Sequence, residues 1–449
     1  MIPKLKLIPA AGLAFALASM PALGQTPDLN QEQEIASIKK QMDAMRSLYE
    51  QQIQALETRI QTLEKQKTVE KSPSQPAVLA ARPQGLGREF QIGLSVSTAA
   101  GGSSENNEVL SNLQRGEHDP NKNGFTLQSG ELFLGGSVSP DFDAQANIIF
   151  KIDAEGETLV ELEEMFFVTR TLPYGFQVKG GQYFTEFGRA NAMHLHQWDF
   201  VDQPVILSRL FGPDGLRSQG VRVSWLPRLP WYSEFFLGAQ NAKGETAVSF
   251  LGNAGEEIAG FTLGDRQSRN LSDLLYAARW LNGFDVSDRL SVNLGFSGLY
   301  GPNATGSDTK TYVVGGDLYA KWQPESTQRG FPFVAFHAEA LYRNYEAGDP
   351  ARIRLDDWGA FGQVIYGFSP GLASGLRLDF AGSDGNDPTD PFRDTRWRLS
   401  PNLTWFPTEF TKVRLQYNRD WAQFLPNDSA DTIWLQFQFS LGSHFAHTF

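Results

Sequence analysis

Apolar and polar side chains alternate along the chain from residue 88 onward. In the stretch 432–449 seven large apolar residues have odd numbers: Ile433, Leu435, Phe437, Phe439, Leu441, Phe445 and Phe449. A period of two is typical of a β-strand with one apolar face. The pattern recurs in sixteen segments, among them 90–96, 144–152, 290–300, 334–342 and 413–421. The sequence therefore predicts an all-β domain over residues 88–449.

The connections between these strands alternate in length. Those after even-numbered strands are short, such as SPDFD and TLPYG, whereas those after most odd-numbered strands are long and polar, at about 99–124, 185–217, 243–270, 301–311, 346–356, 383–393 and 422–431. Short turns on one side and long loops on the other are typical of a transmembrane β-barrel. Aromatic residues gather by the short turns, where a membrane-interface belt is expected: Trp225, Trp231, Tyr232, Trp280, Trp322, Phe368, Trp405 and Phe406. We therefore predict a 16-stranded antiparallel transmembrane β-barrel.

Closure of the barrel explains the apolar face of the last strand. An unpaired strand edge in hydrocarbon would leave backbone polar groups without partners, at several kcal/mol each. The last strand must therefore pair with the first. A final strand that ends on phenylalanine also resembles the recognition signal of Gram-negative outer-membrane proteins. That resemblance implies an outer membrane as the location, with lipid and lipopolysaccharide as surroundings.

The first 87 residues differ in kind from the barrel. Residues 1–24 combine two lysines, a short apolar run and small residues at Ala22 and Gly24, which is typical of a secretory signal peptide. Within 25–67, apolar residues follow a 3,4 spacing with two consecutive steps of four, which predicts a coiled-coil oligomerisation segment with a stutter. The alternative is a single amphipathic helix lying on the barrel. Residues 68–87 are rich in Pro, Ser and Ala and are expected to form a linker.

Composition excludes several other classes of function. The net charge is −12, and removal of a signal peptide with two lysines makes it more negative, so we expect no nucleic-acid binding. Cysteine is absent, which excludes disulfides and thiolate metal sites. The sequence contains no convincing Ser/His/Asp set, so we expect neither an enzyme nor a cofactor.

The strand parity also selects the side chains that face the barrel interior. Acids expected there are Glu131, Asp317, Glu339, Asp379 and Asp420. Basic residues form a strip along one wall and recur on the earlier strands: Arg377, Arg396, Arg398, Lys412 and Arg414, with Lys151, Lys179, Arg222, Arg279, Lys321 and Arg343. Such charges can simply keep a channel wet, or they can form a transverse field that selects solutes. The fourth strand fits the parity least, because Glu164 shares a face with Leu162, Phe166 and Val168.

The connection at about 185–217 differs from the other loops in being strongly apolar. We expect it to fold inward and narrow the bore, which is otherwise an aqueous channel in a barrel of this size. Five charged residues would then lie near the constriction: Arg189, Asp199, Asp202, Arg209 and Arg217. His194 and His196 suggest a metal site, but the sequence supplies no third ligand at a usable spacing, so no metal is expected.

Residues 160–225 resemble the phosphate-selective porin O and P family of Gram-negative outer-membrane porins. The matching positions are Glu163, Glu164, Phe166, Gly181, Gln182, Tyr183, Phe187, Gly188, Phe200, Val201, Pro204, Gly220, Val221 and Arg222. The resemblance implies a homotrimer with an inward third loop. Thr185 stands where the family often has lysine, and the chain is acidic. These two departures favour a general porin over phosphate selectivity.

These observations lead to three hypotheses. The first is a porin with a water-filled channel for passive diffusion of small hydrophilic solutes and ions, and with its coiled coil in the periplasm. The second keeps the fold and makes the protein a phosphate- or polyphosphate-selective anion channel. The third makes it an envelope tether that is anchored by the barrel and acts through residues 25–67.

Overall fold

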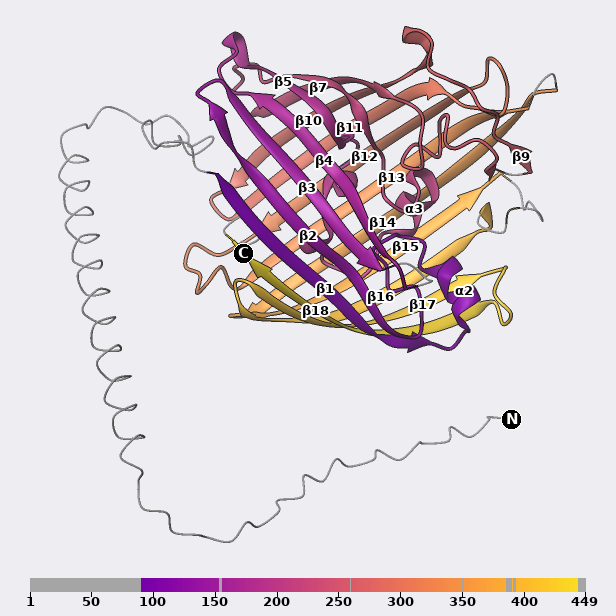
Figure 1. Cartoon of the computed structure of the whole chain (residues 1–449). Coiled ribbons are helices and arrows are strands. Elements are labelled where there is room, and N and C mark those ends of the chain that lie inside the picture. The colour runs from indigo at the N-terminus through magenta and orange to yellow at the C-terminus, as the bar shows by residue number, and fades with distance from the viewer. Residues whose placement is uncertain are drawn as a thin grey trace, which may run out of the picture. The chain divides into compact units, whose positions relative to one another are not determined.

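The computed structural model describes residues 90–152, 156–258, 260–348, 351–384, 390 and 393–442. The expected signal peptide, coiled coil and linker lie outside the described residues, as do Phe445 and Phe449. Sixteen strands form one closed antiparallel barrel, in which strands that follow one another along the chain pair side by side (Figure 1). The prediction of a 16-stranded antiparallel barrel is therefore confirmed.

The barrel strands are β1 (Gln91–Ser103), β2 (Gly124–Ser139), β3 (Phe142–Ile152), β4 (Thr158–Thr169), β5 (Phe176–Phe184), β6 (Arg217–Trp225), β7 (Tyr232–Asn241), β10 (Leu274–Ser287), β11 (Leu290–Pro302), β12 (Lys310–Trp322), β13 (Phe333–Ala347), β14 (Ile353–Ser369), β15 (Leu372–Ser383), β16 (Arg396–Thr408), β17 (Thr411–Ala422) and β18 (Ser429–Leu441). The loops carry the helices α2 (Asn107–Leu113) and α3 (Val205–Phe211), the two-stranded sheet β8 (Glu257–Ile258) and β9 (Phe261–Thr262), and four 3₁₀ turns, Pro173–Gly175, Ala190–Ala192, Leu195–Gln197 and Leu271–Asp273.

Pairing of the first strand with the last closes the barrel. β1 runs antiparallel to β18 from the pair Leu94 and Leu441 to the pair Ser103 and Thr432. The odd-numbered apolar residues of β18 from Ile433 to Leu441 face outward, whereas Trp434 and the polar residues between them are buried inside. No backbone edge of the barrel therefore remains open along this seam.

The outer surface of the barrel is apolar, as a membrane-facing surface requires. Stacked or tilted rings run across β5, β6, β7, β10 and β11, with centroid separations of 5.8 to 6.2 Å, through Phe176, Trp225, Phe235, Trp280 and Phe296. Such a stripe of exposed aromatic rings is typical of a membrane-interface belt. Among the described residues, no helix is both long enough and apolar enough to span a bilayer.

The strict parity predicted for β4 is wrong because the strand contains a β-bulge. Asn147 of β3 pairs with Glu164 and the next residue, Ile148, pairs with Leu162, so Glu163 is an extra residue in the ladder. The outward positions change from Leu162 to Met165 across the bulge. Glu163 and Glu164 both turn inward and are buried, and Glu164 no longer shares a face with Leu162.

The expectation that the loops other than 185–217 are solvated also needs correction. Residues 243–270 bury Ala247, Phe250, Leu251 and Leu263 in the same apolar cluster as the inward segment. These side chains cover apolar surface that would otherwise face water, which makes their burial favourable. In the first loop, Leu110 and Leu113 of α2 are buried in a similar way.

Candidate functional site: the inward loop and its anchors

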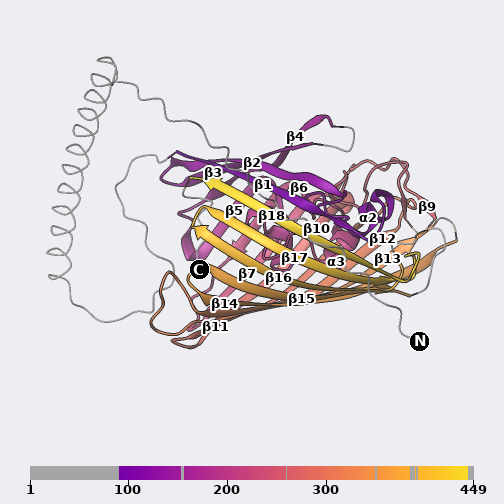
Figure 2. The ribbon, with the colours of Figure 1, turned by 90° about the horizontal axis from the view of Figure 1, so that it is seen from below.

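Residues 185–216, here called the inward loop, cross the barrel interior from β5 and β6 to the opposite wall. α3 lies against β14 and β15 inside the ring of strands (Figure 2). Near the start of the loop, the backbone N–H groups of Arg189 and Ala190 donate to Glu339 Oε1 of β13, at 2.8 and 2.7 Å. Gly188 just before them has a φ of 59°, and a Cβ there would collide with the Glu339 carboxylate. Glycine therefore permits this close approach.

Asp202 anchors the middle of the inward loop. Its carboxylate accepts hydrogen bonds of 2.6 to 3.1 Å from Gln114, Arg377, Arg398, Gln416 and Asn418. Burial alone would raise the pKa of Asp202, but Arg398 and Arg377 outweigh it and hold the pKa below its usual value. The carboxylate is thus charged and joins the inward loop to β15, β16, β17 and the first loop.

The basic strip faces the interior, as the parity predicts, but it is buried beneath the inward loop. Arg377 pairs with Asp202 and Asp379, and Arg396 pairs with Asp420. Arg398 pairs with both Asp202 and Asp420. The charges of these arginines are therefore neutralised by carboxylates of the inward loop and the barrel wall.

Two further members of the strip bind backbone carbonyls of the inward loop. Lys412 Nζ donates to the carbonyls of His196 and Trp198 at 3.2 and 3.3 Å. Arg414 also donates to the carbonyl of Trp198, at 2.8 Å. The strip thus satisfies loop carbonyls that strand pairing cannot reach.

Five of the six basic residues predicted on the earlier strands are also ion-paired, including Arg279 with Asp317 and Arg343 with Asp357. Lys321 instead lies 5.4 Å from the ring centroid of Phe333. Lys179 and Arg222 both contact Glu186, at 3.1 and 3.0 Å. Lys151 pairs with Glu117 and Glu161, and Arg217 pairs with Glu161. The interior wall from β3 to β6 therefore carries a chain of alternating charges.

The remaining predicted loop residues have different environments. The Arg189 guanidinium lies 4.0 Å from the ring centroid of Tyr319 and is half-buried. Asp199 accepts a hydrogen bond of 3.0 Å from Gln363. Arg209 of α3 donates to the carbonyls of Arg393 and Asp394 in the loop between β15 and β16. Of these three, Arg189 and Asp199 remain the more available to a solute.

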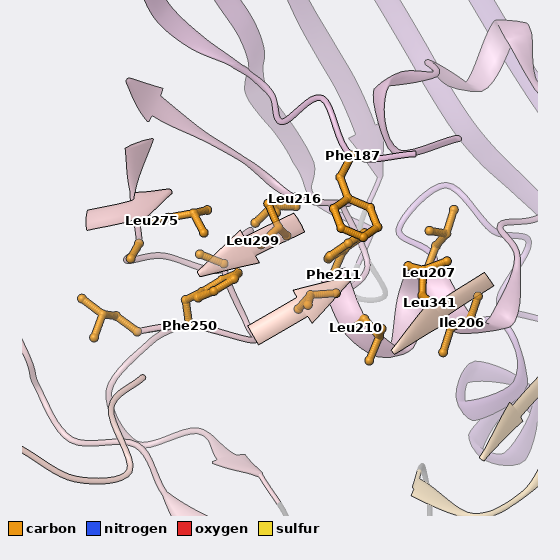
Figure 3. Packing of buried hydrophobic residues seen from close by; sticks show 14 of the residues in the cluster. Phe187, Ile206, Leu207, Leu210, Phe211, Leu216, Phe250, Leu275, Leu299 and Leu341 are labelled. Carbon is orange, nitrogen blue, oxygen red and sulfur yellow. The ribbon is translucent and has the colours of Figure 1, made fainter. Parts of the chain in front are cut away.

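An apolar cluster fixes the second half of the inward loop (Figure 3). Phe187 and Phe211 meet edge to face with centroids 5.2 Å apart. Around them pack residues of α3, the loop 242–273 and the inner wall, including Ile206, Leu207, Leu210, Leu216, Phe250, Leu275, Leu299 and Leu341. Wall residues that face the bore are apolar here because the loop covers them.

A second group of side chains was not foreseen from the sequence. His194 Nδ1 and Nε2 lie 2.7 and 2.9 Å from carboxylate oxygens of Glu163 and Glu164. His196 Nδ1 lies 2.8 Å from Glu131 Oε2. The carboxylates come from β2 and β4, far from the histidines along the chain, so spacing gave no signal for them. The second glutamate joins the group only because of the bulge in β4.

A small cavity lies between the inward loop and the wall. Its lining combines aromatic, acidic and imidazole side chains, among them His118, Glu163, Trp198, Asp199, His337 and Phe361. A mixed polar and aromatic lining of this kind suits small hydrophilic molecules.

Comparison with known proteins gives one clear relative. An uncharacterized protein of Aquifex aeolicus (strain VF5) is 34% identical over 357 residues, which span 73% of this chain and 71% of the relative. The chain belongs to the same family as this Aquifex protein. No family model matches the sequence.

Two solved structures resemble the fold. The outer membrane channel DcaP of Acinetobacter baumannii is 13% identical, with a TM-score of 0.53 over 81% of this chain and 100% of that one. The anion-selective porin from Comamonas acidovorans is 9% identical, with a TM-score of 0.50 over 79% of this chain and 100% of that one. At these identities the likeness extends to the barrel architecture alone.

Proposed function

We propose that this protein is an outer-membrane porin for passive diffusion of small hydrophilic solutes and ions, through a bore that the inward loop narrows. The observation that carries the proposal is a closed barrel with an apolar exterior and an interior crossed by an anchored loop. An apolar outer face requires lipid, and a polar inner face requires water. The resemblance to outer-membrane channels in architecture supports the same location.

Conductance in a planar bilayer tests the proposal. We expect purified, refolded protein to form channels with a small, steady conductance that rises linearly with salt concentration. Because the arginines of β15 and β16 are ion-paired and Lys412 and Arg414 are buried against loop carbonyls, the reversal potential in a salt gradient should show weak selectivity. A folded protein that inserts and carries no current would contradict the proposal.

A phosphate-selective channel is the second candidate, supported by the resemblance of residues 160–225 to that porin family. The half-buried Lys179 and Arg189 are the cations that could contact an anion. Phosphate should then block chloride current saturably, and the reversal potential should indicate strong anion preference. Unselective, unblocked current would favour general diffusion.

Two further parts of the proposal concern assembly. We infer a homotrimer from the family resemblance, and cross-linking of detergent-solubilised protein tests it. The expected coiled coil at 25–67 would reach into the periplasm, where it could also tether the envelope. A tether without a pore would show envelope attachment and no conductance.

A further inference from the structure

Six buried side chains gather where the inward loop meets β2 and β4. They come from four separate parts of the chain, namely the first loop, β2, β4 and the inward loop, and are each at most 8% exposed. We call them the histidine–glutamate cluster: His118, Glu131, Glu163, Glu164, His194 and His196.

The three carboxylates of this cluster form ion pairs with imidazoles. In the part of the chain that the structure describes, their ion pairs are all with histidines. Buried carboxylates are costly unless they are paired or coordinate a metal. Neutral histidines would leave the cluster with excess negative charge, whereas a divalent cation would remove most of it.

Three potential ligand atoms converge at the centre of the cluster. His194 Nδ1 lies 2.7 Å from Glu163 Oε2 and 3.3 Å from Glu131 Oε1, and the ligand atoms of the three residues lie within 4.8 Å of one another. Glu163 also lines the cavity beside the inward loop, which gives an ion a path to the site. A fourth coordination position could be filled from that side by water.

The surrounding groups orient these three ligands as a metal site requires. His194 Nε2 lies 2.9 Å from Glu164 Oε2, so an N–H donated there leaves Nδ1 free to bind a metal. Glu131 is held at Oε2 by His196 Nδ1, at 2.8 Å, and at Oε1 by an amide N–H of Asn147, at 2.6 Å. Metal-binding histidines usually donate their other ring N–H to a carboxylate or carbonyl, and binding carboxylates are themselves hydrogen-bonded.

We propose that Glu131, Glu163 and His194 bind a divalent transition-metal ion, with Zn²⁺ as the probe. One imidazole and two carboxylates suit Zn²⁺, whereas Ca²⁺ and Mg²⁺ prefer oxygen ligands throughout. The ion joins the inward loop to β2 and β4, whereas the Asp202 anchor joins the loop to β15, β16 and β17.

Titration calorimetry on the folded full-length chain in detergent, after removal of metal by EDTA, tests this site. We expect one Zn²⁺ per chain and no comparable binding of Ca²⁺. His194→Gln and Glu163→Gln should each weaken Zn²⁺ binding at least tenfold, and Glu164→Gln should weaken it about tenfold. Zn²⁺ should also raise the thermal midpoint of the unmodified protein and not that of His194→Gln.

His337→Gln is the matched control, because His337 is buried elsewhere in the barrel and pairs with Glu339 at 2.9 Å. It should bind Zn²⁺ as the unmodified protein does. X-ray absorption of the Zn²⁺-loaded unmodified protein should show one imidazole among oxygen ligands, a result that does not depend on any variant folding. The proposal would be overturned if Zn²⁺ did not bind stoichiometrically, or if His194→Gln and Glu163→Gln bound it as tightly as the unmodified protein. It would also be overturned if the coordination shell of the bound zinc contained no imidazole.

Discussion

Asp202 is the residue at which the inward loop is most strongly joined to the barrel wall. Its two nearest cations, Arg377 and Arg398, are buried and have further acidic partners in Asp379 and Asp420. We expect Asp202→Ala to lower the free energy of unfolding by about 3 kcal/mol, because removal of one partner leaves buried charge uncompensated. The released loop should also give larger and noisier single-channel conductance. Thermal unfolding and planar-bilayer recordings measure the two effects.

Asp199→Ala is the control for the anchor. Asp199 lies in the same loop, but among the described contacts its carboxylate accepts one hydrogen bond, from Gln363. Its loss should cost about 1 kcal/mol and leave the noise of the current unchanged. Equal effects of the two substitutions would show that Asp202 has no special role.

Asp119 should make stability depend on pH. Burial raises the pKa of this carboxyl from 3.8 to about 6, with a further contribution from the neighbouring Asp202. The folded state therefore holds the proton more tightly than the unfolded state. The resulting stabilisation is complete below pH 3.8 and is lost as the pH rises through about 6. The thermal midpoint should thus fall from pH 5 to pH 7.5 by less in Asp119→Asn than in the unmodified protein.

The full difference between 3.8 and about 6 corresponds to roughly 3 kcal/mol, of which roughly 1.4 kcal/mol is lost between pH 5 and pH 7.5. Asp265→Asn is a suitable comparison, because a hydrogen bond from Lys243 lowers the pKa of Asp265. The Asp265 carboxyl titrates below pH 5, so Asp265→Asn should not alter the change of the thermal midpoint with pH. Identical pH slopes for Asp119→Asn and the unmodified protein would contradict the prediction.

At the scale of single residues, strand parity predicted which side of the barrel wall a side chain faces, but not which residues it would contact. Arg377, Arg396 and Arg398 face inward as expected, because alternation alone decides the side of a strand. Arg377 and Arg398 are ion-paired with Asp202, which lies more than 170 residues away from both along the chain, whereas Arg396 pairs with Asp420. Glu131, Glu163 and His194 could likewise each be singled out from the sequence, but their convergence at one point could not.

At the scale of elements, the bulge in β4 makes a prediction that strict alternation does not. A thiol-reactive label attaches only at an introduced cysteine, because the chain itself contains no cysteine. A fluorescent label at Leu162→Cys and at Met165→Cys should be quenched by brominated lipids in both cases, although the two positions differ in parity. Strict alternation would place the two labels on opposite sides of the barrel wall.

Phe166→Cys serves as the control for these labels. Lys179 Nζ lies 4.5 Å from the Phe166 ring, which places that side chain on the inner face. A label there should escape quenching by lipid. Quenching at Phe166→Cys with none at Met165→Cys would mean that the bulge is absent in the membrane.

The strands themselves were largely predictable from the sequence, but the β-bulge in β4 and the packing of the loop 243–270 were not. Ten residue pairs join β1 to β18 in unbroken register, because each strand keeps one apolar face. The bulge at Glu163 interrupts that rule without a glycine or proline to mark it. The loop 243–270 looked polar by composition, and its few apolar residues became important only against the inward loop.

At the scale of the whole molecule, the barrel should function without the residues that precede it. Deletion of residues 25–87 should leave heat-resistant folding in detergent and single-channel conductance unchanged, because the described contacts that close the barrel lie within 91–441. Envelope attachment in cells should weaken if that segment acts as a tether. Loss of conductance on deletion would instead give it a part in the pore.

The seam between β1 and β18 has a consequence for biogenesis. β1 can pair with β2 early, but its second ladder cannot form until β18 has been translated. A chain that lacks some of the barrel strands would leave two strand edges with unpaired backbone N–H and C=O groups. Such an incomplete barrel is therefore not stable in lipid. The polypeptide must therefore be kept from aggregating until its final hairpin arrives, and insertion into lipid has to follow synthesis.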